Sequence, residues 1–440
     1  MAVKVCKFGG TSMADGNVMS RVRNIIESDK DRKYVVVSAP GKRYSGDVKI
    51  TDILYQCHRE VEERGACGAS FELIRNRFNS IVRELNIDFD INSVLDETER
   101  RINAEKDEDF TASRGEYLSA RVMAEVLGAK FIDAEDVIFF DKNGAYDAAK
   151  SDKAINDALR GAEKAVFPGF YGRGYNGKVK TFSRGGSDIS GAIVARAVNA
   201  TVYENWTDVS GFLACDPRIV DSPRRIKALS YKELRELSYM GANVLHSESI
   251  FPVRKANIPI HIKNTFRPED EGTLIQPSVY YTPSGSIVTG IAGKKDFTVI
   301  FIEKSLMNYQ IGFVRKVLSV LEKYNVPVEH IPSGIDTMSV VIECSALKDG
   351  KLELILQGIK EAVAPDVLRV NEDIALIATV GHGMSSSVGT SARLFKAMAE
   401  ASVNVRMIDQ GSSELNIIVG VKNEDCEKCI RAIYREFFGN

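Results

Sequence analysis

The stretch "VCKFGGTSMA", residues 5–14, decides the fold of the first half of the chain, because a strand meets a glycine turn there. Asp15 follows at once and is a common N-cap residue, so we expect a helix to begin beside the turn. Glycines let backbone N–H groups approach a phosphate, and Lys7, Thr11 and Ser12 add a charge and two hydroxyls. The lysine precedes the glycines, whereas it follows them in a P-loop. A purely structural turn, with the lysine in water, is the alternative.

The composition is that of an ordinary globular protein. The 440 residues exceed what one core usually organises, so we expect two or three domains. Hydrophobic residues make up 44% and charged residues 27%, with a net charge of −2. This balance gives no global basic surface, and no apolar run reaches the ~20 residues that span a bilayer. We expect neither a nucleic acid nor a membrane partner.

The N-terminus and the cysteines predict a cytoplasmic protein. "MAVKVCKFGG" enters a strand directly and lacks the sections of a signal peptide. Seven cysteines are scattered along the chain, and only Cys426 and Cys429 lie close, within an amphipathic helical pattern. No second cluster or histidine pair accompanies them, so reduced thiols are favoured over a metal or redox site.

Short apolar runs alternate with helical patterns over about the first 280 residues, which predicts an α/β domain with a mainly parallel sheet. Helices are expected over 15–30 and most of 51–127. The strand-like runs are "VKVCKF", "YVVVSA", "AKFIDA", "KAVFPGFYG", "ATVYENWTD" and "IPIHIKN". In such sheets ligands bind beyond the carboxyl ends of the strands.

Proline, glycine and charge in "TFRPEDEGTLIQPSVYYTPSG", residues 265–285, indicate a domain boundary. A weak repeat follows, in which strand, helix, strand, strand and helix recur after about 75 residues. Each half is typical of a ferredoxin-like arrangement. In the first half, "VPVEHIPSG" is expected to be one of the strands. Neither half carries an obvious catalytic cluster, so we expect a regulatory or assembly module.

A second glycine pair occurs in "FSRGGSDISG", residues 182–191. Arg184 could grip a carboxylate, the glycine N–H groups a phosphate, and Asp188 a metal or proton. In the alternative interpretation, Ser187 or Asp188 is simply the N-cap of the next helix. The combination suits a small acidic substrate beside a nucleotide.

Two further stretches carry weaker signals. "ENWTDVSGFLACDPRIV", residues 204–220, is a polar loop that could surround a nucleotide, although Asp-Pro-Arg is also an ordinary turn. Arg114, Glu116 and Arg121 in "SRGEYLSARV" are most simply a solvated helix face. The five histidines lack ligand spacing. Phosphoryl transfer to an acid needs charge neutralisation and positioning, which lysine, glycine N–H groups, arginine and a carboxylate can supply.

Together these motifs resemble the aspartokinases of the amino-acid kinase superfamily. The resemblance rests on "KFGGTS" at 7–12, "VVVSA" at 35–39, "FSRGGSD" at 182–188, "TDVSG…DPR" at 207–218 and "GANVLHSESI" at 241–250. "VEHIPSGIDTMSVV" and "VRMIDQGSSELNIIVGV" are similar to the paired ACT domains of that family. It implies a carbamate-kinase-like α/β domain, a mainly parallel sheet sandwiched by helices, over 1–285. Two βαββαβ ACT domains would follow at 296–368 and 369–440, with strand 287–294 pairing with the last.

The resemblance implies that ATP, with Mg2+, phosphorylates the side chain of L-aspartate in lysine, threonine and methionine synthesis. Lys7 and Asp188 would be catalytic, and no other direct protein ligand of the metal is expected. The phosphate-binding residues would be Gly9, Gly10, Thr11, Gly185 and Gly186. The aspartate pocket would comprise Ser38, Thr51, Glu116, Phe170, Arg184 and Ser187. The nucleotide site would comprise Thr207, Asp208, Asp216, Arg218 and Asn243.

The tail implies regulation by a pathway amino acid, with lysine as the preferred effector and threonine as the alternative. The candidate effector residues are Met307, Gly312, Phe313, Glu329 and Ser333. Glu329 would pair with the ligand amine. The resemblance further implies a homodimer through the ACT domains, which could pair into a tetramer. We expect no dehydrogenase fused to the kinase, because 440 residues leave no room for one after the two ACT-like units.

The chain departs from the family pattern at three places. Asn243 replaces a lysine, Leu213 replaces a tyrosine of the nucleotide loop, and the loop in "APGKRYSGDVKI" is longer than in many relatives. We hypothesise that this basic loop is a mobile lid. Two alternatives to an aspartokinase are a degenerate kinase kept as an amino-acid sensor and a kinase for another small acid.

Overall fold

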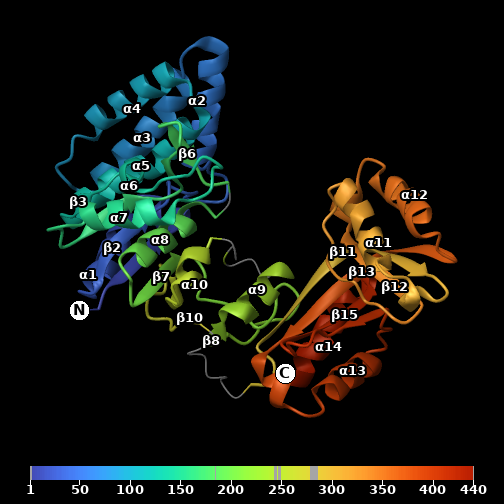
Figure 1. The fold of residues 1–440 in the computed structure, drawn as a ribbon. Coiled ribbons are helices and arrows are strands. Elements are labelled where there is room, and N and C mark those ends of the chain that lie inside the picture. The colour runs from blue at the N-terminus through green and yellow to red at the C-terminus, as the bar shows by residue number, and fades with distance from the viewer. Residues whose placement is uncertain (1, 184, 242–244, 246–248, 278–285, 440) are drawn as a thin grey trace. The chain divides into compact units, whose positions relative to one another are not determined.

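The computed structural model describes residues 2–183, 185–241, 245, 249–277 and 286–439. The chain divides into two compact units (Figure 1). Unit 1 comprises Met1–Phe212, Lys227–Leu234 and Asn243–Thr282. Unit 2 comprises Leu213–Ile226, Arg235–Ala242 and Pro283–Asn440.

Unit 1 is built on an eight-stranded, mostly parallel sheet in the order β3-β4-β2-β1-β7-β9-β10-β8. β9 and β10 are its antiparallel neighbours. The strands are β1 (Lys4–Phe8), β2 (Arg32–Val37), β3 (Lys130–Phe131), β4 (Ala165–Pro168), β7 (Val202–Thr207), β8 (Ala228–Ser230), β9 (Ile260–Asn264) and β10 (Thr273–Gln276). A separate hairpin joins β5 (Tyr171–Arg173) and β6 (Val179–Thr181).

Helices pack against this sheet (Figure 1). The first begins where the sequence predicted, because the Asp15 side chain accepts a hydrogen bond from the Val18 N–H. The helices are α1 (Gly16–Glu27), α2 (Ile50–Arg64), α3 (Gly68–Leu85), α4 (Ile91–Glu105), α5 (Glu108–Leu127), α6 (Ala134–Val137), α7 (Ala148–Ala158), α8 (Gly186–Ala197) and α10 (Phe251–Lys255). A further helix, α9 (Tyr231–Tyr239), begins in unit 1, and its residues from Arg235 onward belong to unit 2. The predicted α/β fold with a mainly parallel sheet is therefore confirmed.

Unit 2 contains a five-stranded antiparallel sheet in the order β12-β11-β13-β15-β14. Two 14-residue strands, β11 and β13, run through both of its halves, and Gly290–Lys294 pairs with Leu376–Val380. The strands are β11 (Gly290–Glu303), β12 (Thr337–Glu343), β13 (Val367–Val380), β14 (Met407–Asp409) and β15 (Asn416–Lys422). The helices are α11 (Phe313–Lys323), α12 (Lys351–Val363), α13 (Thr390–Glu400) and α14 (Cys426–Phe438).

One strand prediction in unit 2 was wrong. The segment "VPVEHIPSG", residues 326–334, forms only isolated bridges, from His330 to Val341 and from Ser333 to Met338. Pro327 and Pro332 lack the N–H groups that a continuous ladder needs, so the β-branched residues between them cannot complete one.

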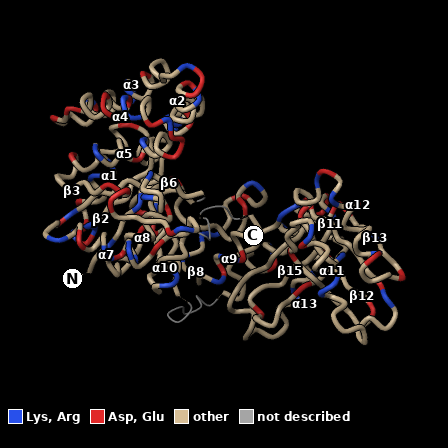
Figure 2. Tube along the Cα trace, turned by 45° about the horizontal axis from the view of Figure 1, so that its top comes forward, with Lys and Arg blue, Asp and Glu red and all other residues tan. Residues whose placement is uncertain are grey.

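Lys and Arg positions are interspersed with Asp and Glu positions along the chain trace of each unit (Figure 2). This pattern agrees with the small net charge. No helix in the described part of the chain is long and apolar enough to cross a membrane.

Candidate active site

The carboxyl ends of neighbouring parallel strands bring the two glycine motifs of unit 1 together. Strand register sets Lys7 opposite Val36 of β2 and Asn205 of β7. Since side chains alternate between the two faces of a strand, Lys7 and Asn205 emerge on the same face of the sheet.

Lys7 and Asp188 form the central ion pair of the site. Lys7 is 8% exposed, and its Nζ lies 2.6 Å from Asp188 Oδ1. Asn205 Nδ2 donates to the same oxygen at 3.0 Å. The sequence therefore predicted two of the three groups, and it missed Asn205. A buried amide inside the apolar strand "VYENWT" was the available signal.

Backbone conformation explains the glycines of the second turn, where Gly185 and Gly186 have positive φ, but not Gly9 of the first turn, whose φ is −73°. Gly9 and Gly10 lead from β1 into a short 3-10 helix at Gly10–Met13, and the Gly9 N–H donates to the Trp206 carbonyl at 3.1 Å. Gly185 is the N-cap of α8, with φ +74°. Ser187 and Asp188 therefore lie in the first turn of this helix and are not its N-cap, so that alternative is wrong. The helix N-terminus is suited to bind an anion.

Glu116 is a buried carboxyl group near the ion pair. It is 6% exposed, and burial raises its pKa to about 8 despite a hydrogen bond from the Ala39 backbone and the positive charges of Arg114 and Lys7. Its Oε2 has no hydrogen-bond partner. A buried, unsatisfied carboxylate oxygen is well suited to receive an ammonium group.

The interpretation of this helix face as solvated was wrong for two of its three residues. Arg114 is 1% exposed, with its guanidinium over the rings of Phe110, Tyr117 and Tyr171 at 4.2–5.2 Å. Glu116 is likewise buried, whereas Arg121 is half-buried. α5 packs against both α2 and β4, so most of its central part is shielded from water, with Tyr117 and Arg121 only partly buried.

Two of the other candidate substrate residues, Ser38 and Phe170, lie beside the first turn of α8. Ser38, just after β2, donates from its Oγ to Ser187 Oγ at 2.9 Å. Phe170 has φ +79°, an unusual conformation for a residue with a side chain, and lies 3.8 Å from the position of a Cβ on Gly186. Thr51 lies in the first turn of α2. Arg184 lies outside the described residues.

The candidate nucleotide residues are divided between the units. In unit 1, Thr207 is the last residue of β7 and the exposed Asp208 follows it, and Thr207 Oγ1 donates to Asp208 Oδ1 at 3.2 Å. Asp216 and Arg218 belong to unit 2, where they form an ion pair at 2.6 Å. Asn243 lies outside the described residues.

The loop at 40–49, hypothesised above to be a mobile lid, is held by hydrogen bonds in the structure. Asp47 is 8% exposed and receives hydrogen bonds from both Arg43 and Arg77. These guanidinium groups, Arg43 first, hold the pKa of Asp47 well below its usual range. The sequence singled out the basic residues of this loop and missed its buried acid.

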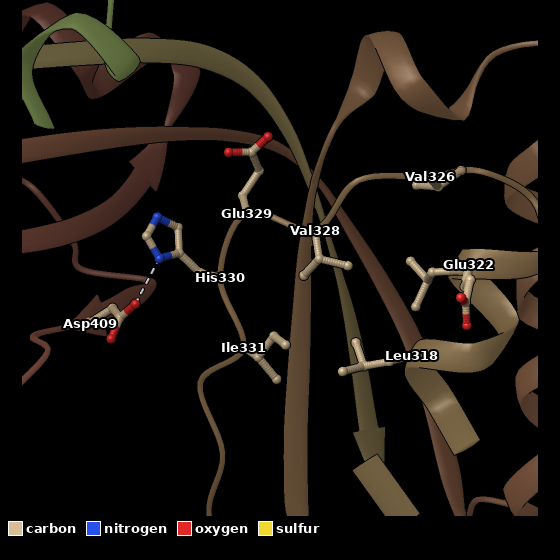
Figure 3. A pocket seen from close by; sticks show the side chains of 9 residues that line it. Leu318, Glu322, Val326, Val328, Glu329, His330, Ile331 and Asp409 are labelled. Atoms are coloured by element: carbon tan, nitrogen blue, oxygen red, sulfur yellow. Dashed lines mark hydrogen bonds and ion pairs between the residues drawn. The ribbon is translucent and has the colours of Figure 1, made fainter. Parts of the chain in front are cut away.

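Of the five candidate effector residues of unit 2, Glu329 lines a pocket of about 550 Å3 (Figure 3), whereas the other four are not among its lining residues. Glu329 and His330 line it, and His330 Nδ1 is paired with Asp409 Oδ2 at 2.7 Å. Glu329 also accepts a hydrogen bond from the Tyr239 hydroxyl. Met307 is buried behind the start of α11, where Gly312 is the N-cap and Phe313 the first residue. Ser333 forms the isolated bridge described above.

Comparisons with known proteins agree with this geometry. The amino acid kinase family matches residues 2–264, and an ACT domain matches residues 377–437. Aspartokinase 3 of Bacillus subtilis (strain 168) is 38% identical over 99% of both chains. The chain belongs to the aspartokinase family. It is an aspartate kinase with C-terminal ACT domains.

Solved aspartokinase structures resemble the whole chain. The aspartate kinase of Clostridium acetobutylicum is 51% identical, with a TM-score of 0.91 and full coverage of both chains. E. coli aspartokinase III in complex with aspartate and ADP, described as an R-state, is 26% identical. Its TM-score is 0.76, with coverage of 99% of this chain and 100% of that one. A T-state complex of that enzyme contains lysine and aspartate.

Metal and thiol chemistry also bear on the site. The described residues contain no group of three or more His, Cys, Asp or Glu side chains that could hold a metal ion. A single carboxylate beside phosphate-binding turns nevertheless suits Mg2+, which takes many of its ligands from nucleotide phosphates and water. The seven cysteines are free thiols, Cys426 and Cys429 among them.

Proposed function

We propose that this aspartokinase transfers the terminal phosphoryl group of ATP to the side-chain carboxylate of L-aspartate. The products are ADP and 4-phospho-L-aspartate, in the first step toward lysine, threonine and methionine. The Lys7–Asp188 pair, with buried Glu116 close enough to influence it, is the observation that carries this proposal. The E. coli complex with aspartate and ADP supports both substrates.

The charges of the site suit this reaction. Lys7 exchanges its carboxylate partner for phosphate oxygens and stabilises the transferring group with Gly9, Gly10 and Thr11. Asp188 would hold Mg2+ at this site, and the bound ion would supply positive charge to neutralise the phosphates. Gly185 and Gly186 present α8 to the phosphates. Lys7 and Asp188 would therefore each keep a partner of opposite charge after their mutual ion pair opens to admit the nucleotide.

L-Aspartate carries both an ammonium and carboxylate groups, so its recognition needs a negative and a positive side chain. Glu116 meets the substrate ammonium, and Arg184 holds a carboxylate. The pocket is completed by Ser38, Thr51, Phe170 and Ser187. The nucleotide is held by Thr207, Asp208, Asp216, Arg218 and Asn243.

The test is ADP release with aspartate, glutamate, acetylglutamate and UMP as separate acceptors, with hydroxylamine trapping of the acyl phosphate. Turnover is expected with aspartate alone. Lys7→Met should lower kcat by on the order of 10²–10³, because an electrostatic group aimed at the reacting phosphate is lost. Lys4→Met is the matched control, since Lys4 lies on the same strand and pairs with Asp29 at 2.7 Å. Full activity of Lys7→Met, or preference for another acceptor, contradicts the proposal.

An amino-acid sensor derived from a kinase is the second candidate, favoured only by Leu213 and Asn243. It predicts aspartate binding in calorimetry with no ADP release. The retained Lys7, Glu116 and Asp188 argue against it, because a sensor needs no phosphoryl-transfer groups.

We further propose feedback inhibition through unit 2, with the ACT domains at 296–368 and 369–440 and the kinase domain at 1–285. Lysine is the preferred effector and threonine the alternative, and the lysine-bound T-state of the E. coli enzyme supports lysine. Glu329 pairs with the effector ammonium, near Met307, Gly312, Phe313 and Ser333. The subunits form a homodimer through these domains, which can pair into a tetramer. A cytoplasmic location fits the free thiols.

Calorimetry with lysine and with threonine tests the effector. Heat is expected with lysine, and Glu329→Gln should weaken binding at least tenfold, since a charged hydrogen bond is lost. Glu322→Gln, on the same pocket wall, is the control. Binding of neither amino acid would reject the proposal, and sedimentation measures the oligomer.

A further inference from the structure

The loop at 40–49 joins two proposed aspartate-binding residues, Ser38 and Thr51, and is fixed by one buried ion pair. Both oxygens of Asp47 accept hydrogen bonds from Arg77 Nη2 of α3, at 2.9 and 2.8 Å. The exposed fractions are only 8% for Asp47 and 6% for Arg77. Arg43 adds a second two-point contact to the same carboxylate from within the loop.

Arg77 also contacts the backbone on both sides of the phosphate site. Its Nη1 donates to the Gly41 carbonyl at 3.2 Å and to the Ala14 carbonyl at 3.5 Å. Gly41 belongs to the anchored loop, and Ala14 ends the segment that begins with the glycine turn. One guanidinium therefore ties the loop and the phosphate segment to the same helix.

The loop and the glycine turn are in backbone contact. The Gly41 N–H donates to the Gly10 carbonyl at 2.8 Å. A Cβ on Gly41 would lie 2.7 Å from the Gly10 carbonyl carbon and 2.9 Å from the Thr11 nitrogen. With no side chains between the two segments, a shift of the loop moves the phosphate-binding backbone directly.

The chemistry of the pair favours positioning over simple stabilisation. A buried ion pair adds little net stability, because desolvation offsets its attraction. The planar Arg77 guanidinium is, however, held through two nitrogens, with Nη2 on the Asp47 carboxylate and Nη1 on the Gly41 carbonyl, and this geometry fixes its direction and distance closely.

We propose that Arg77 and Asp47 are positioning residues for phosphoryl transfer. They hold loop 40–49 against the glycine turn, so that Ser38, Thr51 and the Gly10 backbone keep the geometry that aligns aspartate with the nucleotide. This inference rests on the proposed function. Arg77 touches no reacting atom and acts through the two loops.

The kinetic experiment compares Arg77→Lys and Asp47→Asn with Arg75→Lys in the full-length enzyme. Arg75 lies on the same helix and pairs with Asp96 and Glu99 at 2.7 and 2.8 Å, away from the loop. We expect kcat/KM to fall by about 10–100-fold in the first two variants, with higher KM for both substrates, because small misplacements are costly in rate. Asp47→Glu, which keeps the charge, should recover part of the loss. Arg75→Lys should change Tm without changing kcat or KM.

Hydrogen exchange supplies a readout that needs no turnover. The Gly41 amide and the amides of Gly10–Met13 should exchange faster in Arg77→Lys than in Arg75→Lys. Arg43→Gln, which removes only the partly exposed contact, serves if the buried variants fail to fold, and should show a smaller shift of the same sign. Unchanged kinetics and exchange in a folded variant overturn the inference. Absence of aspartate turnover in the unmodified enzyme instead refutes the proposed function. The exchange result still tests whether Arg77 and Asp47 hold loop 40–49 against the glycine turn.

Discussion

At the scale of the residue, strand alternation separates two polar clusters that lie side by side in the sequence. Lys7 and Asn205 face the proposed active site, whereas Cys6 and Glu204 point to the other face of the same paired strands. Burial alone would raise the pKa of Glu204, but Arg32, at 2.8 Å, lowers it overall. The Glu204 cluster is therefore a structural ion pair of the sheet, and the cluster of Lys7 and Asn205 is available for chemistry.

Glu116 makes the affinity for aspartate depend on pH. Burial raises its pKa to about 8, so at neutral pH the group is largely protonated and must ionise to bind an ammonium. The KM for aspartate should therefore fall as pH rises from about 6 to 8, by up to tenfold per unit. Glu116→Gln should bind aspartate more weakly and with a flat profile. Steady-state kinetics from about pH 6 to 8 measure this dependence. A KM for aspartate that does not change with pH in the unmodified enzyme contradicts the prediction.

The same shift affects stability. A carboxyl group with a raised folded-state pKa favours folding fully below its unfolded pKa, near 4.5, and this contribution is lost as pH rises toward about 8. Glu116→Gln should therefore raise Tm more at pH 8 than at pH 4.

At the scale of the element, close approach of backbones decides how α5 presents Glu116. A Cβ on Gly115 would lie 2.6 Å from the Ala39 Cβ and 3.4 Å from Ile50 Cγ2. The helix can therefore lie against the end of β2 and the start of α2 only because this position has no side chain.

Gly115→Ala should consequently reduce both stability and aspartate affinity, although alanine normally favours a helix. Overpacking costs about 1–3 kcal/mol and displaces Glu116 from Ala39. The matched control is Gly68→Ala at the start of α3, where the nearest atom is 4.0 Å away, and a gain of up to about 1 kcal/mol is expected. Denaturant unfolding and the KM for aspartate provide the measurements. A Gly115→Ala enzyme as stable as the Gly68→Ala one would contradict the packing argument.

At the scale of the whole molecule, the two halves of unit 2 share their central strands. β11 pairs with β12 over Phe297–Glu303 and with β13 over its whole length, and β13 continues to β15. The hydrophobic core between α11, α12 and the sheet is therefore continuous with strands of the other half.

A cavity in one half should for this reason destabilise the other. Ile359→Ala removes a fully buried side chain of α12, at a cost of about 2–5 kcal/mol. Native-state hydrogen exchange should show lost protection in β15 as well as in β12. Leu354→Ala, on the same helix but half-exposed, is the control. Protection lost in β12 alone would show that the halves unfold independently.

The sequence by itself determined the mainly parallel sheet, the glycine turns and the pairing of Lys7 with the Asp188 segment. These features follow from local periodicity and from residue types that only certain chemistry needs. It did not predict Asn205, the burial of Arg114 or the Asp47–Arg77 pair, and it misjudged residues 326–334. Residues 326–334 are limited locally by two prolines. The other three features depend on which elements pack together, as α3 does with the loop that carries Asp47, 30 residues before Arg77. Only the packed structure decides whether a charged side chain faces water, a ring or a partner of opposite charge.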